Sequence, residues 1–251
     1  MEGQTMTPPI LVAEDLVAGY FEDIHILQGI SVQAWPGRIT CVLGPNGTGK
    51  STLLKTLFGF LRPVQGRVIY QGEDITGLPP YEMPNRGIAY LPQRPSIFPF
   101  LSVEVNLRLG AWHERRDRRQ VREKIEELYR RFPLLWEKRY QPAGQLSGGQ
   151  QRQLEIARSL MTDPVLYLID EPTAGIDPQT SEAIYRMIHQ LAREQGKAIL
   201  LVDQNIKKAL EIADYIYVVR VGTLFAEGPR EAFGRDTEAL VARWLYASGE
   251  P

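Results

Sequence analysis

The segment from Gly44 to Ser51 restricts the fold of this chain more than any other part of the sequence. It fits the pattern G-x-x-x-x-G-K-[ST], which chance gives in roughly one per cent of chains of this size at average composition. The apolar run Ile39–Leu43 before it predicts a short buried strand, and Thr52–Phe58 after it predicts a helix. Strand, glycine-rich loop and helix form the setting in which this pattern binds phosphate.

Each residue type in this loop has a chemical reason. Glycines allow the backbone to curl so that several N–H groups point inward, and the following helix adds the positive end of its dipole. We expect the loop to hold the α- and β-phosphates of a nucleotide, with Lys50 at the β- and γ-phosphates and the Ser51 hydroxyl on Mg²⁺. The nucleotide-binding residues predicted here are Gly44, Pro45, Asn46, Gly47, Thr48, Gly49, Lys50, Ser51 and Thr52.

An acidic pair follows another apolar run. Val165–Ile169 predicts a strand buried on both faces, and it ends in Asp170 and Glu171, at the edge where parallel sheets usually bind ligands. We expect Asp170 to join the Mg²⁺ coordination shell and Glu171 to polarise the attacking water, two roles that phosphoryl transfer to water requires. Acidic residues that merely end a strand are a weaker explanation, because two carboxylates beside a phosphate loop are costly without a metal ion or water.

A second glycine-rich turn, Leu146–Gln150, has the sequence Leu-Ser-Gly-Gly-Gln. Ser147 is a favourable helix N-cap. Apolar residues recur behind it at helical spacing, at Leu154, Ala157, Leu160 and Met161. The free N–H groups and the dipole at such an N-terminus can also meet phosphate. A capped helix after a flexible turn explains the same residues without a ligand, so the residues alone leave both interpretations open.

Strands and helices alternate from Thr40 onward, which predicts an α/β core. The other expected strands are Ile10–Val17, Ile26–Val32, Gly66–Tyr70, Ile88–Leu91, Ala198–Asp203, Tyr215–Val219 and Leu224–Ala226. The other expected helices are Val103–Leu109, the charged segment up to Arg131, the segment after Ser147, Ile206–Ala213 and two short helices that close the chain. The first two strands predict a short antiparallel sheet ahead of the phosphate loop.

The organisation expected is one domain, residues 1–251, with an insertion. Residues 1–93 and 162–251 are expected to form a nucleotide-binding core with its antiparallel β-subdomain, and residues 94–161 an inserted helical subdomain. The proline-rich connector Arg94–Phe100 marks the start of this insertion, and the following charged segment carries apolar residues at helical spacing.

The composition is that of an ordinary globular protein, with 43% hydrophobic and 24% charged residues. Lys+Arg number 29 and Asp+Glu 30, so a net charge of -1 gives no electrostatic case for nucleic acid. The basic run Arg115–Arg122 is followed by Glu123, Glu126 and Glu127 and has no interleaved aromatic residues. A solvated helix face is therefore favoured, and we expect no nucleic-acid partner.

No segment approaches the ~20 apolar residues needed to span a bilayer, since runs such as Ala198–Val202 are short. Met1–Pro9 has neither the basic nor the apolar region of a secretory signal. The single cysteine, Cys41, lies in an apolar run and is expected to be buried, with no disulfide within the chain. We expect a cytoplasmic protein whose role at a membrane comes through partner chains.

Together these motifs resemble those of the ATP-binding subunit of ABC transporters, over essentially the whole chain. The resemblance lies in their order: the phosphate loop, Gln93 after a strand, the signature Leu146–Gln150, the pair Asp170–Glu171, and Ala174–Asp177 where the family has its D-loop. It implies a P-loop NTPase (RecA-like) core with an antiparallel β-subdomain and an inserted α-helical subdomain. It also implies ATP and Mg²⁺ as ligands and ATP hydrolysis coupled to transport.

The resemblance further implies a head-to-tail dimer, made of two copies or of this chain and a similar one, that encloses two ATP molecules. Each nucleotide would lie between the phosphate loop of one subunit and the signature turn of the other. The residues expected to contact it from that turn are Ser147, Gly148, Gly149 and Gln150. Tyr20 falls where the family stacks an aromatic side chain on adenine, Gln93 would contact Mg²⁺ or water, and Asp177 would cross the dimer interface.

One position departs from the family pattern. The family usually places a histidine after the strand Ala198–Asp203 to contact the γ-phosphate, whereas this chain has Gln204 there, and His25, His113 and His189 lie elsewhere. The Gln204 amide can donate a hydrogen bond but cannot take up a proton. We expect hydrolysis to depend chiefly on Glu171, with Lys50 and Gln204 assisting.

Within the family, several segments narrow the comparison. Asp74–Pro80, Ile97–Pro99 with Leu101–Glu104, and Val202–Asn205 look like the second ATPase subunit of branched-chain amino acid importers, and amide and urea importers share them. Gln93–Phe98 and Leu154–Arg158 are also similar to the lipopolysaccharide-export ATPase.

The partners expected for a transporter subunit are transmembrane permease subunits, a second ATPase subunit and, for an importer, a solute-binding protein, with this chain peripheral on the inner face of the cell membrane. A soluble ABC ATPase of iron–sulfur cluster assembly is the alternative from a different class. A nucleotide-binding regulator with little hydrolysis is less favoured, because Lys50, Asp170 and Glu171 are all present.

Overall fold

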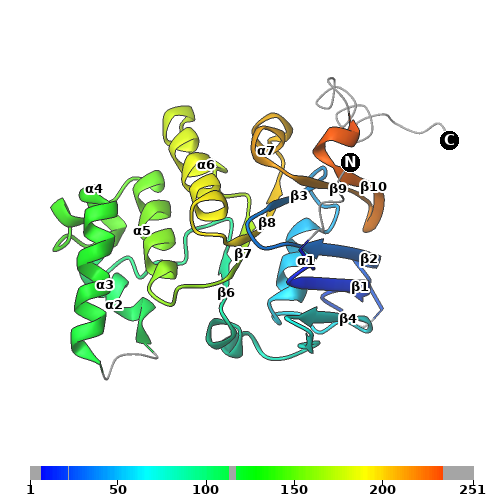
Figure 1. The fold of residues 1–251 in the computed structure, drawn as a ribbon, viewed down its shortest axis with the longest axis horizontal. Coiled ribbons are helices and arrows are strands. Elements are labelled where there is room, and N and C mark those ends of the chain that lie inside the picture. The colour runs from blue at the N-terminus through cyan, green and yellow to red at the C-terminus, as the bar shows by residue number, and fades with distance from the viewer. Residues whose placement is uncertain (1–6, 22, 113–116, 234–251) are drawn as a thin grey trace. The chain divides into compact units, whose positions relative to one another are not determined.

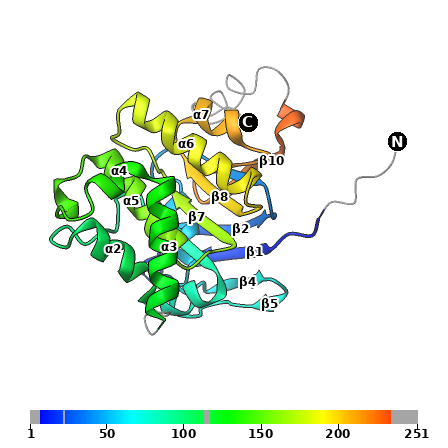
Figure 2. The same ribbon diagram turned by 60° about the vertical axis from the view of Figure 1, so that its left-hand side comes forward.

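The computed structural model describes residues 7–21, 23–112 and 117–233 of the chain. By its contacts the chain divides into two compact units. Of the described residues, the first contains 7–21, 23–90, 165–171 and 187–233, and the second contains 91–112, 117–164 and 172–186. Figures 1 and 2 show the helices and strands that build each of them.

A six-stranded sheet, counted over the described residues, forms the centre of the first unit, in the order β10-β9-β3-β8-β7-β6 (Figure 1). Its strands are β3 (Ile39–Leu43), β6 (Ile88–Leu91), β7 (Leu166–Asp170), β8 (Ala198–Asp203), β9 (Tyr215–Arg220) and β10 (Thr223–Pro229). The β3, β7 and β8 strands are parallel and every residue in them is buried. Because the strands are parallel, their carboxyl ends share one edge, where Leu43 pairs with Asp203 and Asp170 with Val202.

A four-stranded antiparallel sheet, counted in the same way, completes the strands of this unit, in the order β2-β1-β4-β5. Its strands are β1 (Leu11–Ala18), β2 (Leu27–Ala34), β4 (Gln65–Tyr70) and β5 (Glu73–Asp74). Buried and more exposed residues alternate along much of β1, as expected for a sheet with one face in the core.

Helix α1 (Lys50–Leu57) directly follows the phosphate loop, and its Leu53, Leu54 and Leu57 are at most 2% exposed. They belong to one hydrophobic core that also contains residues of both sheets, such as Leu16 and Leu168. Burial of this apolar stripe fixes the helix, and thereby the loop before it, relative to the two sheets.

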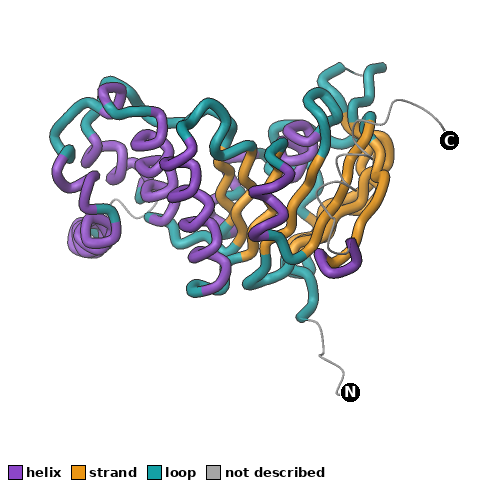
Figure 3. Tube along the Cα trace, turned by 90° about the horizontal axis from the view of Figure 1, so that it is seen from above, coloured by secondary structure: helices purple, strands orange, loops and turns teal. Residues whose placement is uncertain are grey.

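The second unit is built mainly from helices, drawn in purple in Figure 3. They are α2 (Val103–Gly110), α3 (Arg118–Arg131), α4 (Pro133–Glu137), α5 (Gly148–Leu160) and the start of α6 (Pro178–Arg193), which continues into the first unit. Short 3-10 turns lie at Ala143–Gln145 here and at Pro80–Glu82, Pro84–Arg86 and Arg230–Phe233 in the first unit.

Asn106 of α2 is fully buried. Its side-chain NH2 group donates to the carbonyls of Phe98, Leu101 and Ser102, and its side-chain oxygen accepts from the Phe98 N–H. This amide therefore orders the connector that leads to α2.

The α/β core with an antiparallel sheet and a helical insertion is confirmed, and most expected elements lie within one or two residues of the predicted bounds. Two helices of the described chain, the short α4 and the long α6, were absent from the expected elements. The signal for α6 was present, because Ile184, Ile188 and Leu191 are spaced by four and three residues and all are fully buried. The two short helices expected to close the chain fall mostly outside the described residues, as does most of the N-terminal segment.

Helix α7 (Ile206–Ile212) follows β8, and its N-terminus is capped by Asn205, whose side chain accepts from the N–H of Lys208. Within the described ranges, no helix has both the length and the apolar character that a membrane span needs.

Candidate active site

The phosphate loop joins β3 to α1, and its backbone is shaped by glycines. Gly47 and Gly49 have φ angles of 82° and 102°, in the left-handed region that favours glycine. At Gly44 the limit is space, because an added Cβ would lie 2.5 Å from the carbonyl oxygen of Val219. The Thr48 hydroxyl donates to the Pro45 carbonyl at 3.0 Å, which closes the curl of the loop.

Lys50 lies inside this loop rather than on its surface. Its side chain is 4% exposed, and Nζ donates to the carbonyls of Gly44 at 2.8 Å and Pro45 at 2.9 Å. Nζ is also 3.7 Å from Oε1 of Glu171. Burial lowers the pKa of Lys50, while the carboxylates of Glu171, Asp170 and Asp203 oppose this effect. The ammonium is therefore held on the loop by carbonyl dipoles and acidic neighbours.

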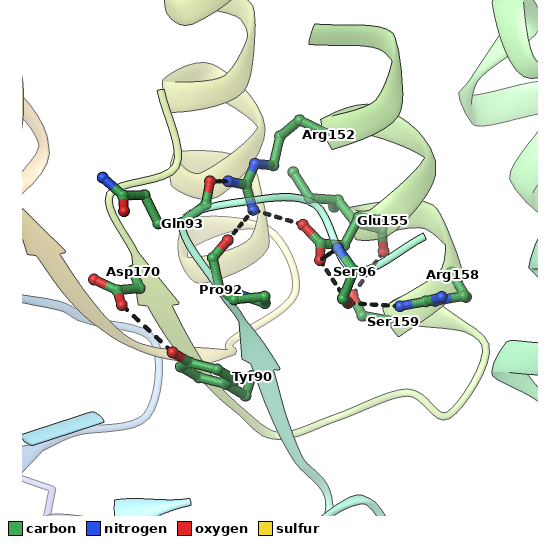
Figure 4. A network of polar contacts seen from close by, with 10 residues as sticks. Tyr90, Pro92, Gln93, Ser96, Arg152, Glu155, Arg158, Ser159 and Asp170 are labelled. Atoms are coloured by element: carbon green, nitrogen blue, oxygen red, sulfur yellow. Dashed lines mark hydrogen bonds and ion pairs between the residues drawn. The ribbon is translucent and has the colours of Figure 1, made fainter. Parts of the chain in front are cut away.

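Ser51 and Asp170 meet directly. The Ser51 hydroxyl donates to Oδ1 of Asp170 at 2.9 Å. The Tyr90 hydroxyl donates to Oδ2 at 3.4 Å, as Figure 4 shows. Burial raises the pKa of Asp170, and these two hydrogen bonds work against that rise. A hydroxyl and a carboxylate that converge in this way offer the oxygen ligands that Mg²⁺ prefers.

Glu171 carries backbone strain. Its φ of 41° lies in the left-handed region, which costs a residue other than glycine of order 1–3 kcal/mol, and its N–H donates to the carbonyl of Val202 at 2.9 Å. That hydrogen bond continues the pairing of β7 with β8 past the end of the strand. It holds the Glu171 carboxylate beside Lys50 as the chain turns away from the sheet.

Asp203 is an acidic residue at this edge that motif reasoning missed as a site residue. It is 2% exposed at the end of β8, opposite Leu43 in the register, and its Oδ1 accepts from the N–H of Asn205 at 2.9 Å. The available signal was a carboxylate that ends a buried parallel strand, the same signal that singled out Asp170. Gln204, the next residue, is exposed.

Tyr20 contacts α1, the helix that follows the phosphate loop. Its side chain is 48% exposed, and its hydroxyl accepts from Nζ of Lys55, one helical turn beyond Ser51, at 3.1 Å. The Lys55 ammonium also lies 5.3 Å from the centre of the Tyr20 ring. The ring thus has a fixed neighbour and a solvent-accessible face.

In the second unit, the Leu146–Gln150 turn starts α5 with a capping box. Ser147 Oγ accepts from the Gln150 N–H at 3.4 Å, and the Gln150 side chain accepts from the Ser147 N–H at 3.1 Å. A Cβ at Gly149 would lie 2.1 Å from the methyl carbon of Thr180, whereas a Cβ at Gly148 would meet nothing within 4 Å. Ser147 and Gly148 are exposed, while the Gln150 side chain is used within the chain.

The two other predicted site residues of this unit are both exposed. Asp177 caps α6, where its carboxylate accepts from the Thr180 N–H at 2.9 Å, and hydrogen bonds from the side chain and then the N–H of Thr180 lower its pKa. Gln93 follows β6, and its backbone carbonyl accepts from Nη2 of Arg152 at 2.5 Å. The structure therefore brings Lys50, Ser51, Asp170 and Glu171 together in the first unit. Gln93, the signature turn and Asp177 lie in the second.

This protein is in the class of P-loop nucleoside triphosphatases. Four residues at the sheet edge define the class here: Lys50 and Ser51 at the phosphate loop, Asp170 at the end of β7, and Glu171 directly after it. The chain belongs to the ABC transporter family, whose family model, "ABC transporter", matches residues 27–174. It is an ATP-binding subunit of that family and an ATPase.

Known relatives and a solved structure agree with this assignment. The "high-affinity branched-chain amino acid transport ATP-binding protein" BraG of Pseudomonas aeruginosa is 40% identical over 85% of this chain and 91% of its own length. The "lipopolysaccharide export system ATP-binding protein" LptB of Haemophilus influenzae is 37% identical over 91% of this chain and 94% of its own length. The crystal structure of a nucleotide-free ATP-binding cassette from an ABC transporter superposes on this chain with a TM-score of 0.83 at 30% sequence identity. The superposition covers 97% of this chain and 100% of that structure's chain.

The buried carboxylate of Asp170 leads to a prediction on stability. Replacing it in Asp170→Asn keeps an amide oxygen that can accept from Ser51 and adds an NH2 group that can donate to the Tyr90 hydroxyl oxygen, while it removes a charge whose burial is unfavourable. We expect the nucleotide-free variant to melt about 2–4 °C higher than the wild type at neutral pH, roughly 1 kcal/mol for a chain of this size.

The same variant has a defined pH dependence. Because the folded-state pKa of Asp170 is raised, the folded wild type keeps this proton while the unfolded chain releases it, so its stability falls as pH rises from about 4 through the raised pKa. The difference in melting temperature is therefore full above that pKa and shrinks in acid. Asp177→Asn, at a carboxylate with a lowered pKa, is the control and should give no gain. A lower melting temperature for Asp170→Asn at neutral pH would contradict the prediction.

Proposed function

We propose that this chain hydrolyses Mg-ATP at the phosphate loop and drives solute transport through separate permease subunits, with branched-chain amino acids or related small solutes as the cargo. The observation that supports hydrolysis most directly is the Glu171 carboxylate, 3.7 Å from the Lys50 ammonium at the end of β7. A carboxylate that can act as a base and an ammonium that can bind phosphate lie next to each other, which supports transfer of a phosphoryl group to water.

The residues around Asp170 fit a magnesium ion that arrives with the nucleotide. Among the residues that the structure describes, no group of three or more His, Cys, Asp or Glu side chains is arranged to hold a metal. Ser51 and Asp170 would supply one oxygen each, and phosphate oxygens and water would complete the shell, which is the usual mode for Mg²⁺. Gln93 is the third side chain we assign to this ion or to its water.

In the hydrolytic step, water attacks the γ-phosphorus, the bond to the oxygen that bridges to the β-phosphate breaks, and ADP and phosphate leave. Glu171 takes the proton from the water, and Lys50 binds the phosphate oxygens on which charge accumulates. Gln204 donates an amide hydrogen bond to the γ-phosphate. Tyr20 stacks on the adenine, for which its exposed ring face is suited.

We assign the remaining predicted residues to a dimer. Ser147, Gly148 and Gly149 of a second subunit would cover the γ-phosphate, with Gln150 holding that turn in shape through the capping box. Asp177, exposed at the start of α6, would lie across the interface. The dimer would bind permease subunits on the inner face of the cell membrane, together with a solute-binding protein on the other side.

Export of lipopolysaccharide is the second candidate. Ser96 and Glu155 lie in the two segments that are also similar to the lipopolysaccharide-export ATPase, and these two side chains are hydrogen-bonded to each other at 2.8 Å. Because this contact joins the two segments in space, we count their similarity to the lipopolysaccharide-export ATPase as a single observation. The match to LptB covers slightly more of this chain than the match to BraG, at lower identity.

Removing the general base should trap the dimer. In Glu171→Gln the amide cannot accept the proton of the attacking water, so we expect hydrolysis to fall by at least about 100-fold and an ATP-bound dimer to accumulate on a sizing column. The same variant with ADP is the control and should elute as a monomer. A monomer at saturating Mg-ATP would count against this arrangement.

Gln204 should leave a signature in the pH profile. We expect no inflection between pH 6 and 7 in the ATPase rate of the wild type, and we expect Gln204→His to introduce one near the ordinary histidine pKa of about 6.5. The measurement is the steady-state rate from pH 5.5 to 8.5 for both proteins. An inflection in both proteins, or in neither, would contradict the proposed contact of Gln204 with the γ-phosphate.

Reconstitution tests the cargo. The chain is purified with its permease subunits, placed in liposomes, and supplied with a solute-binding protein and radiolabelled leucine, isoleucine or valine. We expect uptake that requires ATP and is lost in Lys50→Ala. Retention of polytopic partners without amino acid uptake, but with ATP-dependent release of lipopolysaccharide from the membrane, would favour the second candidate. A soluble partner complex alone would overturn transport.

A further inference from the structure

We propose that Arg152 and Glu155, a buried ion pair on α5, are positioning residues for Gln93 in ATP hydrolysis. They hold the backbone that carries Gln93 and fasten it to the helix that begins with the signature turn. This inference rests on the proposed role of Gln93 at the magnesium ion or its water. All the contacts below lie within the second unit (Figure 4).

Arg152 binds the chain at Gln93 through its backbone. Its side chain is 1% exposed, Nη1 donates to the Pro92 carbonyl at 2.7 Å, and Nη2 donates to the Gln93 carbonyl at 2.5 Å. Two successive carbonyls are thus held by one planar guanidinium, which fixes the peptide planes on both sides of the Gln93 Cα atom. The Gln93 side chain starts from a fixed point while remaining exposed.

Glu155 joins this arrangement from the next turn of α5. Its Oε2 accepts from Nη1 of Arg152 at 2.5 Å, and its Oε1 accepts from the N–H and the hydroxyl of Ser96 at 2.7 and 2.8 Å. Arg158 donates to the same Ser96 hydroxyl at 2.8 Å. The connector is therefore held on both sides of Arg94 and Pro95, by carbonyls before them and by Ser96 after them.

The helix that makes these contacts also makes the signature turn. α5 starts at its N-cap Ser147, and Arg152 lies five residues further, about 7 Å along the helix axis. A helix moves as a rigid segment over such a distance. A displacement of the connector at Gln93 is consequently transmitted to the turn at Ser147, and the reverse holds equally.

Stability alone explains this ion pair poorly. A fully buried pair of charges gains little over apolar side chains of similar size, because both ions lose their hydration. Apolar side chains, however, cannot donate to the carbonyls of Pro92 and Gln93 or accept from Ser96. The feature that only these charged side chains provide is the fixed geometry of the connector.

The experiment is a double-mutant cycle in the full-length chain with Glu155→Gln, Gln93→Ala and both together. We expect Glu155→Gln to lower kcat about tenfold with less than a twofold change in KM for ATP. If Glu155 acts through Gln93, the double variant has the kcat of the slower single variant, since the second change removes nothing further. Glu123→Gln, in the exposed pair with Arg119 on α3, is the matched control and should keep the wild-type kcat.

The outcomes separate this inference from the role of Gln93. If Gln93→Ala lowers kcat but the two effects multiply in the double variant, the positioning role is wrong and the role of Gln93 stands. If Gln93→Ala leaves kcat unchanged, both are wrong. To separate geometry from folding, Arg152→Met with Glu155→Met removes both charges. We expect a melting temperature within a few degrees of the wild type and still a reduced kcat, and a wild-type kcat in this variant would overturn the proposal.

Discussion

The structure depends on the ammonium of Lys50 being held, almost without solvent contact, among backbone carbonyls and carboxylates at the edge of the parallel sheet. The charge has left water, so it needs the carbonyls of Gly44 and Pro45 and the acidic groups that face it. Those acidic groups come from the ends of two neighbouring strands, β7 and β8, whose parallel register places Asp170 and Asp203 at one edge. The electrostatics of the site therefore depend on the sheet topology, because a shift in strand register would separate the Lys50 ammonium from the carboxylates that face it.

Several features of this sheet edge lower the free energy of unfolding, and they all involve residues of the candidate active site. Asp170 is a buried carboxylate with a raised pKa, and Glu171 has a backbone conformation that residues other than glycine avoid. Both residues sit where β7 ends and the core no longer determines side-chain choice. The fully buried strands and the α1 leucines offset these costs.

Sequence predicted most of the fold and the first-unit cluster because the signals were local. The phosphate loop needs glycines at positions set by its own backbone, and Asp170 and Glu171 end an apolar run whose both-sided burial already implied a parallel sheet. Asp203 was missed although it ends a buried apolar run in the same way as Asp170. The Arg152–Glu155 pair was missed because its importance appears only in three dimensions, since Arg152 binds the carbonyl of Pro92, some 60 residues away in the chain. Long-range contacts between ordinary polar residues leave no periodicity to detect.

The two glycines of the signature turn, Gly148 and Gly149, are glycines for different physical reasons. Gly149 is required inside the chain, because a Cβ there would overlap the methyl group of Thr180, on the helix that Asp177 caps. Gly148 has an ordinary φ angle and nothing within 4 Å of where its Cβ would be, so neither backbone strain nor crowding within this chain demands glycine. The remaining physical reason for a bare backbone at that exposed position is close approach from outside the chain. With the Gln150 side chain already committed to the cap, the backbone N–H groups at this helix start are the ones that, in the proposed dimer, would meet the nucleotide of the other subunit.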